Sequence, residues 1–417
     1  MFLRLACIRL AAAILPALAA ASAAHAQAPA GPGPGAVNTF SVTAGASTGY
    51  DSDLVASGVP DVESGAAHAG TGLTLNFIRQ SEGFSAYTAA SSEFRYYGAQ
   101  VPIKAPMFSA ASGIATALGR RAVFDAAIQG NYFPRFQLAV MPIATAAPLD
   151  QLPSPDFGVL ADNILSYQGT IGLGYKLSPR TTISGGYGRG HFRSLDDDYE
   201  LRSHAIRGSI SRTLTRNAGL RLGYIDQQAT YGSNAGLGRT QRSRVIDAGI
   251  NYSRPLSLSR RTELSFSTGS TAVDNGSTTR YSVTGSARLN HHLARYWGLA
   301  AIYVRGLGYI GGFDEPLFSD AVSLVLSGRF GRTASVSVSG GYANGVVGFI
   351  TENNDYESYQ ATSRVDIPFG RRLSLYGSYF YYQYRIDDSI VLRNRMPSAL
   401  ARHGVRTGLI WAIFGGR

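Results

Sequence analysis

The feature that most constrains the fold is a short triplet (an apolar residue, a small residue and an arginine) that recurs along the chain. The copies are Leu118-Gly119-Arg120, Leu214-Thr215-Arg216, Leu258-Ser259-Arg260, Leu293-Ala294-Arg295, Phe330-Gly331-Arg332 and Phe369-Gly370-Arg371, with a stretched copy at Leu177-Ser178-Pro179-Arg180. From Leu177 onward the copies are 37, 44, 35, 37 and 39 residues apart. Between them apolar and polar residues alternate, which is the period of a β-strand. A repeated unit of strand, loop, strand and short turn predicts an antiparallel β-barrel made of hairpins.

The length of the alternating segments distinguishes a membrane barrel from a soluble sandwich. Alternation runs from Phe40 to Tyr50, from Leu165 to Leu177 and from Arg280 to Leu289. About ten residues are what a tilted strand needs to cross a bilayer, whereas soluble strands average about five or six. We therefore predict an all-β fold: a single transmembrane antiparallel β-barrel of about 18 strands, with 16 as an open alternative. The expected strands are 38–50, 66–78, 84–97, 108–118, 122–133, 164–177, 181–191, 200–213, 218–229, 241–253, 262–273, 279–290, 296–306, 318–330, 334–345, 356–368, 373–385 and 399–414.

The connections between these strands divide into two classes. Those marked by arginine are short, and the others are longer and acidic. Since outer-membrane barrels have short periplasmic turns and long outside loops, we expect the arginine turns and both termini to be periplasmic and the acidic loops to be extracellular. The acids could meet lipopolysaccharide phosphates through divalent cations or could simply be solvated. They are Asp51, Asp53, Asp150, Asp156, Asp196, Asp197, Asp198, Glu200, Asp314, Glu315, Glu352, Asp355, Asp387 and Asp388.

The N-terminal residues have the pattern of an export signal. Arg4 and Arg9 form a basic region, residues 10–21 are apolar, and Ala24-His25-Ala26 fits a cleavage site. We expect residues 1–26 to be a signal peptide cleaved near Ala26, residues 27–37 to be a Pro/Gly-rich linker, and residues 38–417 to form the barrel. Cys7 is the single cysteine and lies in the signal, so the mature chain is expected to have no disulfide. No other apolar stretch is long enough for a transmembrane helix.

The basic charge of the chain does not indicate nucleic-acid binding. The formal net charge is +11, and lysine occurs at Lys104 and Lys176, so arginine supplies nearly all of the positive charge. The arginines do not form one stripe or motif in the sequence, and an exported protein does not meet nucleic acid. We attribute the excess of arginine over lysine mainly to base composition.

The last strand carries the pattern of an outer-membrane sorting signal. In Arg406-Thr407-Gly408-Leu409-Ile410-Trp411-Ala412-Ile413-Phe414 the signal residues are Gly408, Trp411, Ile413 and Phe414. The chain resembles the porin-like β-barrels of Gram-negative outer membranes. Hairpins from about 199 to 345 look most like uncharacterised barrel proteins associated with exopolysaccharide loci. The resemblance implies location in the cell outer membrane, contact with its lipid and lipopolysaccharide, and insertion by the barrel-assembly machinery.

The sequence offers little that indicates an enzyme, a cofactor or a metal. Gly45-Ala46-Ser47-Thr48-Gly49 matches G-x-S-x-G but lies within a predicted strand, whereas a nucleophile elbow needs a strand, a turn and a helix. The histidines have no partners at a telling spacing. No nucleotide-binding loop, calcium loop or zinc spacing is present. We predict no catalytic, cofactor-binding or metal residues.

A barrel of this size encloses water unless something fills it, so the inward side chains decide its function. The arginines expected to line the lumen are Arg207, Arg221, Arg280, Arg288, Arg329, Arg364, Arg402 and Arg406, and the acids are Glu93, Asp125, Asp247 and Asp366. Unpaired arginines would favour anions. Two functions stay open: a porin-like passive channel for small solutes with an anion preference, and a non-conducting structural or accessory barrel linked to surface polysaccharide export. The sequence does not predict the oligomeric state.

Two further segments carry hypotheses. The connection 134–163 is long, apolar and rich in proline, and we expect it to fold into the barrel mouth and narrow it; the alternative is that it lies over the outer rim or meets a neighbouring subunit. Its constriction candidates are Phe136, Leu138, Met141 and Phe157. The aromatic residues Tyr376, Tyr379, Phe380, Tyr381, Tyr382 and Tyr384 form either a carbohydrate-stacking platform or, as we favour, part of an aromatic girdle at the lipid–water boundary.

Overall fold

A computed structural model describes most of the predicted barrel. It covers residues 37–53, 65–98, 103–133, 163–195, 199–233, 238–255, 261–274, 279–308, 317–331, 333–348, 354–387, 390 and 398–415. In these ranges no helix has the length and apolar character needed to span a bilayer. The expected signal peptide, the linker up to residue 36 and the proposed constriction residues Phe136, Leu138, Met141 and Phe157 lie outside the described residues.

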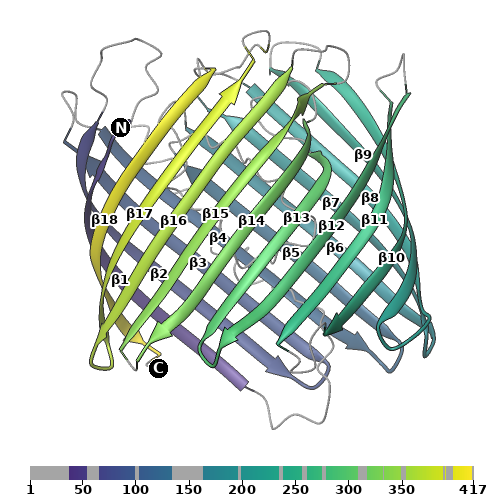
Figure 1. Cartoon of the computed structure of the whole chain (residues 1–417), viewed down its shortest axis with the longest axis horizontal. Coiled ribbons are helices and arrows are strands. Elements are labelled where there is room, and N and C mark those ends of the chain that lie inside the picture. Colours follow the sequence, from purple (N-terminus) through teal and green to yellow (C-terminus); the bar gives the residue numbers. More distant parts are fainter. Residues whose placement is uncertain are drawn as a thin grey trace.

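The described residues form one closed barrel of eighteen strands (Figure 1). Each strand pairs antiparallel with its neighbours in sequence, and β1 pairs with β18, so the sheet has no free edge. The strands are β1 (Val37–Asp51), β2 (Ala66–Ser81), β3 (Phe84–Tyr97), β4 (Ile103–Leu118), β5 (Ala122–Phe133), β6 (Ile164–Ser178), β7 (Thr181–Ser194), β8 (Tyr199–Thr213), β9 (Ala218–Ser233), β10 (Arg239–Pro255), β11 (Thr262–Asp274), β12 (Thr279–Ala294), β13 (Trp297–Gly308), β14 (Leu317–Phe330), β15 (Ala334–Val347), β16 (Asp355–Phe369), β17 (Leu373–Ile386) and β18 (Ala399–Phe414).

The fold class predicted from the alternating pattern is confirmed. Every expected strand overlaps one observed strand, and the alternative of 16 strands is wrong. The observed strands extend beyond several predicted ends: β4 begins at Ile103 rather than at 108, and β10 ends at Pro255 rather than at 253. The alternation fades at these ends while the ladder of hydrogen bonds continues.

The arginine triplets whose residues are all described, at 118–120, 177–180, 214–216, 293–295 and 369–371, lie at tight turns between consecutive strands. Gly119, Gly331 and Gly370 have φ angles of 75°, 60° and 71°, a left-handed conformation that glycine adopts without a steric penalty. Where the small residue is Ser or Thr, its hydroxyl closes the turn instead. Oγ of Ser178 accepts a hydrogen bond from the backbone N–H of Thr181 at 3.1 Å, and Oγ1 of Thr215 accepts one from Ala218 at 3.1 Å. In the described copies with Gly, Ser or Thr, the triplet therefore closes a hairpin turn through one of two local devices.

Successive side chains on a strand point alternately into and out of the barrel. On β18 the outward positions Val405, Leu409 and Trp411 are 54%, 46% and 54% exposed, whereas the inward Arg402 is fully buried. Hydroxyl pairs join neighbouring strands on the inner face, as between Ser184 and Ser209, 2.7 Å apart, on β7 and β8. Across the middle of the strands the outer surface is therefore apolar and the inner surface carries polar side chains, as in a barrel that stands in lipid.

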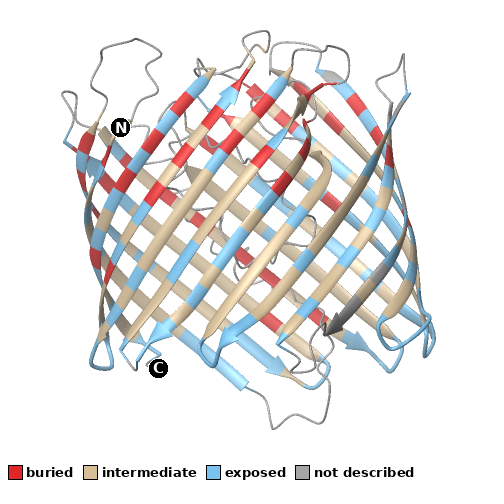
Figure 2. Cartoon of the chain, viewed as in Figure 1, coloured by how far each residue is buried: buried red, intermediate tan, exposed pale blue. Residues whose placement is uncertain are grey.

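The two ends of the barrel differ. One end carries the short turns and the end of β18; we call it the short-turn end. The other carries the longer connections, and inward side chains are mostly buried there (Figure 2). Among them, Tyr97, Tyr199, Tyr356 and Tyr384 are at most 1% exposed. The interior is therefore less accessible at the long-connection end.

Three acids that the sequence assigned to loops belong to strands instead: Asp355 begins β16, and Asp51 and Glu200 also pair with arginine. Asp51 is the last residue of β1 and is 1% exposed, and Glu200 lies in β8. Both carboxylates are held by arginine on the strand ladder, Asp51 by Arg402 and Glu200 by Arg202. The reading of these two residues as solvated or cation-binding loop acids is wrong.

Candidate functional site

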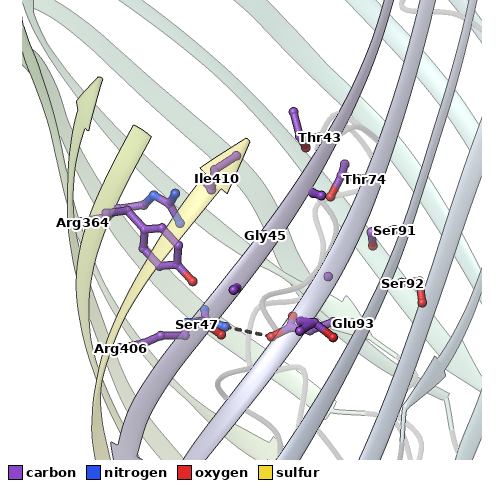
Figure 3. Close-up of a pocket in the computed structure, with 15 residues that line it drawn as sticks. Thr43, Gly45, Ser47, Thr74, Ser91, Ser92, Glu93, Arg364, Arg406 and Ile410 are labelled. Atoms are coloured by element: carbon purple, nitrogen blue, oxygen red, sulfur yellow. Dashed lines mark hydrogen bonds and ion pairs between the residues drawn. The ribbon is translucent and has the colours of Figure 1, made fainter. Parts of the chain in front are cut away.

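The inner wall has a recess of about 230 Å³ where the barrel closes between β18 and β1 (Figure 3). Its floor consists of small residues, since Gly45 and Ser47 of β1 lie beside Thr74 of β2 and Ser91 of β3. Long side chains from β3, β16 and β18 stand around it. Small residues on neighbouring strands leave space that larger inward side chains would fill. The recess therefore exists because the sequence places glycine, serine and threonine at these positions.

Charged side chains form the rim of the recess. Nη1 of Arg406 lies 3.2 Å from Oε1 of Glu93, and this ion pair faces the floor (Figure 3). Nε of Arg95 donates to the same carboxylate at 2.6 Å. Glu93 is thus shared by two arginines: Arg95 is buried behind it, and Arg406 borders the recess, where its guanidinium can donate to an anionic or hydroxyl-rich solute.

The opposite side of the rim combines an ion pair with an aromatic ring. Arg364 donates to both carboxylate oxygens of Asp366, with Nη2 at 2.6 Å from Oδ1 and Nε at 2.9 Å from Oδ2. Its guanidinium also stacks on Tyr376 at 4.2 Å from the ring centroid. These contacts fix Arg364 in one orientation, because the N–H groups at the edge of its guanidinium bind Asp366 while the face of the guanidinium stacks on Tyr376.

Inward glycines on β18 make space for the aromatic residues of β17. A Cβ atom at Gly408 would lie 2.7 Å from Cε1 of Tyr376, and one at Gly404 would overlap the ring of Phe380. Tyr382 and Tyr384 point inward with these rings and are 1% exposed, whereas Tyr379 on the other face is 41% exposed. The favoured interpretation of this aromatic cluster as a girdle is therefore wrong for its inward members, which form part of the inner wall.

A second pair of charges lies elsewhere on the inner wall. Asp125 of β5 and Arg207 of β8 interact electrostatically although two strands separate them. Two glycines leave space for these long side chains. A Cβ atom at Gly172 would lie 2.5 Å from Oδ1 of Asp125, and a Cβ atom at Gly186 would lie 3.3 Å from Cγ of Arg207. Gly172 and Gly186 are themselves partners in the β6–β7 ladder. A bulkier residue at either glycine would separate the two charges.

The arginines proposed for the lumen occur in different surroundings. Arg402, Arg364, Arg406 and Arg207 each face a carboxylate, namely those of Asp51, Asp366, Glu93 and Asp125. The others for which a side chain is described, Arg221, Arg288 and Arg329, alternate with exposed outward residues and so share the inner face.

Arg288 and Arg329 have no carboxylate partner in the described part of the chain. Arg288 donates to the side chain of Asn290 at 3.2 Å. For Arg280 and Asp247 the structure describes the backbone and not the side chain. That these groups line a conducting path stays a prediction.

The sorting-signal residues lie in β18, which closes the barrel against β1. Trp411 pairs with Ala44 and Phe414 with Val42, and both aromatic side chains are exposed on the outer face. Ile413 precedes Phe414 at a shift of register. Gly408 is the inward glycine beneath Tyr376. The structure thus places Gly408 on the inner face and Trp411 on the outer face, and their use as a signal stays a prediction.

One histidine has a carboxylate partner, but the arrangement is not a catalytic triad. Nε2 of His191 on β7 contacts Oε1 of Glu200, which also accepts a hydrogen bond from Arg202 at 2.6 Å. Nδ1 of His191 is buried without a hydrogen-bond partner among the described residues. A nucleophilic hydroxyl would have to occupy that position. The described residues also hold no group of three or more His, Cys, Asp or Glu side chains suited to a metal ion.

Comparison with known proteins adds little beyond the shape of the barrel. The sequence matches no family model and no curated protein. Among solved structures, the chain is similar to Pseudomonas aeruginosa OccK2 (OpdF) in complex with glucuronate, with 12% identity, a TM-score of 0.47 and coverage of 91% of this chain and 100% of that one. It is also similar to Pseudomonas aeruginosa OpdQ, with 10% identity, a TM-score of 0.45 and coverage of 90% and 97%. The siderophore receptor PirA from Acinetobacter baumannii is similar with 9% identity, a TM-score of 0.42 and coverage of 89% of this chain and 80% of that one. At identities and TM-scores this low, these likenesses carry no argument about function.

Proposed function

We propose that this chain is a porin-like channel of the outer membrane that passes small solutes down their concentration gradient. The observation that carries the proposal is the closed eighteen-stranded barrel with an apolar outer face and a polar inner face. Barrels of 16–18 strands are wide enough to hold an aqueous path. An outer face with exposed Ile206, Tyr281 and Val283 would be costly in water, at about 25 cal/mol per Å². Lipid removes that cost, which supports the membrane location.

The chemistry of the inner wall supports a preference for anionic or hydroxyl-rich solutes. Arg288 and Arg329, without carboxylate partners in the described residues, supply positive charge that is not neutralised locally. The recess adds Arg364 and Arg406 beside hydroxyl side chains and an aromatic ring. Arg364 and Arg406 themselves face acids, as do Arg207 and Arg402, so the expected anion preference is modest rather than strong.

The orientation follows from the two classes of connection. We infer that the short-turn end is periplasmic and the long-connection end extracellular, as in bacterial barrels of this kind. The signal peptide and insertion by the barrel-assembly machinery belong to the same proposal.

A second function has one observation in its favour. Inward side chains at the long-connection end are mostly buried, which is the arrangement expected of a barrel closed at that end. This supports a structural or accessory barrel that does not conduct, for instance one linked to surface polysaccharide export.

Solute uptake into proteoliposomes distinguishes the two functions. Purified barrel is reconstituted, and swelling is followed in neutral, anionic and cationic sugars of similar size. A channel gives swelling at rates that fall with solute size and are faster for the anionic sugar. Folded barrel that gives no swelling with any solute would exclude the channel and favour the accessory function.

A further inference from the structure

The outer wall of β7–β10 changes from apolar to charged toward the long-connection end. The outward residues nearer the middle of these strands are large and apolar, and they are exposed: Ile183, Tyr187, Ile206, Ile210, Leu222, Tyr224, Ile246 and Ile250. Beyond them the outward positions carry Arg189, His191 and Arg193 on β7, Glu200, Arg202 and His204 on β8, Asp226 on β9, and Arg242 and Arg244 on β10. We call this second set the outer basic patch.

The strand register joins the members of the patch into one surface. Arg189 pairs with His204, His204 pairs with Gln228, and Gln228 pairs with Arg242. The adjacent row runs from Asp226 to Arg244. Four neighbouring strands span about 14 Å, since strands lie about 4.8 Å apart. The sequence alone does not reveal this surface, because its residues lie on four strands that the register brings together.

The patch has more positive charge than its own acids neutralise. Nε and Nη2 of Arg202 donate to Glu200 at 2.6 and 2.7 Å, and Nε of Arg242 donates to Asp226 at 2.8 Å. Those two acids are thereby engaged. Arg189 and Arg193 make no hydrogen bond or ion pair to any described residue, and Nε of Arg193 is buried without a partner.

Other sectors of the outer wall at the same end are balanced or acidic. On β13 and β14, Nη1 of Arg305 lies 2.9 Å from Oδ2 of Asp320. On β16, Glu357 accepts hydrogen bonds from the hydroxyls of Tyr342 and Tyr359 at 3.1 and 2.7 Å. In these two sectors the outward arginine is paired or the charge is acidic, so the excess of positive charge on β7–β10 is not repeated there.

We propose that the outer basic patch binds the phosphate groups of lipid A, the lipid anchor of lipopolysaccharide, while its acyl chains lie along Tyr187, Ile206 and Ile246. Arginine suits this role because its planar guanidinium binds phosphate through two parallel hydrogen bonds. The position also fits, since the patch lies between the apolar wall and the long-connection end, at the level of lipid headgroups. The inference rests on the proposed membrane insertion and orientation, and it does not depend on whether the barrel conducts.

Lipid binding to the full barrel in detergent tests the proposal. Lipid A with both phosphates, lipid A with its phosphates removed, and phosphatidylglycerol are titrated separately, and bound lipid is counted by native mass spectrometry. The test variant is R189Q/R193Q/R244Q. The matched control is R207Q/R221Q/R288Q, which removes three inward arginines, from β8, β9 and β12. Heat-modifiable migration on gels confirms that each variant is folded.

The expected result is tight binding of phosphorylated lipid A to the wild type and the control. Binding to the test variant should be weaker by on the order of a hundredfold, since each arginine near a lipid surface contributes about a fivefold preference for anionic lipid. Equal binding of the dephosphorylated lipid, or unchanged binding by the folded test variant, would overturn the proposal. Equal affinity for phosphatidylglycerol would overturn the assignment to lipid A. A folded barrel that passes no solute but still binds lipid A selectively would contradict the channel proposal and leave this inference intact.

Discussion

The carboxylate of Asp51, at the end of β1, accepts a hydrogen bond from Nε of Arg402 on β18 at 2.6 Å, although 351 residues separate the two in sequence. Both side chains are almost completely buried, and the Arg402 guanidinium also lies 5.3 Å from the centroid of the Phe380 ring. This pair joins the first strand to the last where the barrel closes. A buried pair of this kind is costly to break, because the remaining charge is left without a partner.

Substitution of one member of this pair should destabilise the barrel. We expect Asp51→Leu to lower the free energy of unfolding by about 3–5 kcal/mol, because it leaves the Arg402 charge buried. Urea unfolding in detergent, followed by heat-modifiable gel migration, measures the change. The double variant Asp51→Leu/Arg402→Leu should recover much of the loss. Asp320→Asn, at an ion pair on the outer face, serves as the control and should change little. A double variant as unstable as the single one would contradict this account of the pair.

The packing of Tyr376 over Gly408 gives a second expected outcome. Gly408→Val should crowd both the Tyr376 ring and the backbone oxygen of Ala46, which would lie 2.5 Å from the added Cβ, and should lower stability by about 1–3 kcal/mol, the usual cost of overpacking. Gly377→Val is the matched control, because no atom lies within 4 Å of the position that its Cβ would take. Thermal unfolding in the same detergent compares the two. Equal midpoints would show that the ring moves aside freely.

Ion selectivity should depend on which inner arginines face acids. We expect Arg288→Gln/Arg329→Gln to reduce the anion preference measured from the reversal potential in a salt gradient, because these arginines are not neutralised by described acids. Asp125→Asn should increase the preference, since it leaves Arg207 without its carboxylate. The outward substitution Arg305→Gln should have no effect. Unchanged reversal potentials in all the inward variants would mean that these side chains do not line the ion path.

The orientation of the barrel can be tested in intact cells. A peptide tag inserted at Asp197, between β7 and β8, should be labelled from outside the cell. A tag inserted at Arg260, between β10 and β11, should not be labelled. Permeabilised cells, in which both tags are accessible, provide the control. Labelling of the Arg260 tag alone would reverse the orientation and would place the outer basic patch in the periplasmic leaflet.

The sequence predicted the architecture because the barrel rests on local rules. Alternation of period two marks each strand, and residues such as Gly119 and Thr215 close turns through their own φ angle or hydroxyl, without distant contacts. The strand ends were less accurate. The hydrophobic signal weakens at the ends of strands such as β4 while backbone pairing continues.

The sites were harder to predict because they depend on register between strands. Tyr376, Phe380, Tyr382 and Tyr384 share even positions, so their common face could have been read from the sequence once Tyr379 was placed outside. The buried partner of Arg402 could not be predicted, because nothing in the local sequence links Arg402 to Asp51. The outer basic patch likewise appears when Arg189 and Arg242 are brought near by pairing across β8 and β9.

Single-channel recording in planar bilayers tests the central claim most directly. Purified, folded barrel is added to one side of a bilayer in symmetric salt, and the current is followed at fixed voltages, with heat-unfolded protein as the control. The account predicts stepwise insertions of uniform conductance and a reversal potential on the anion side when a salt gradient is applied. Folded barrel that inserts, as shown by its protection from protease, and yet gives no current at any voltage would contradict it.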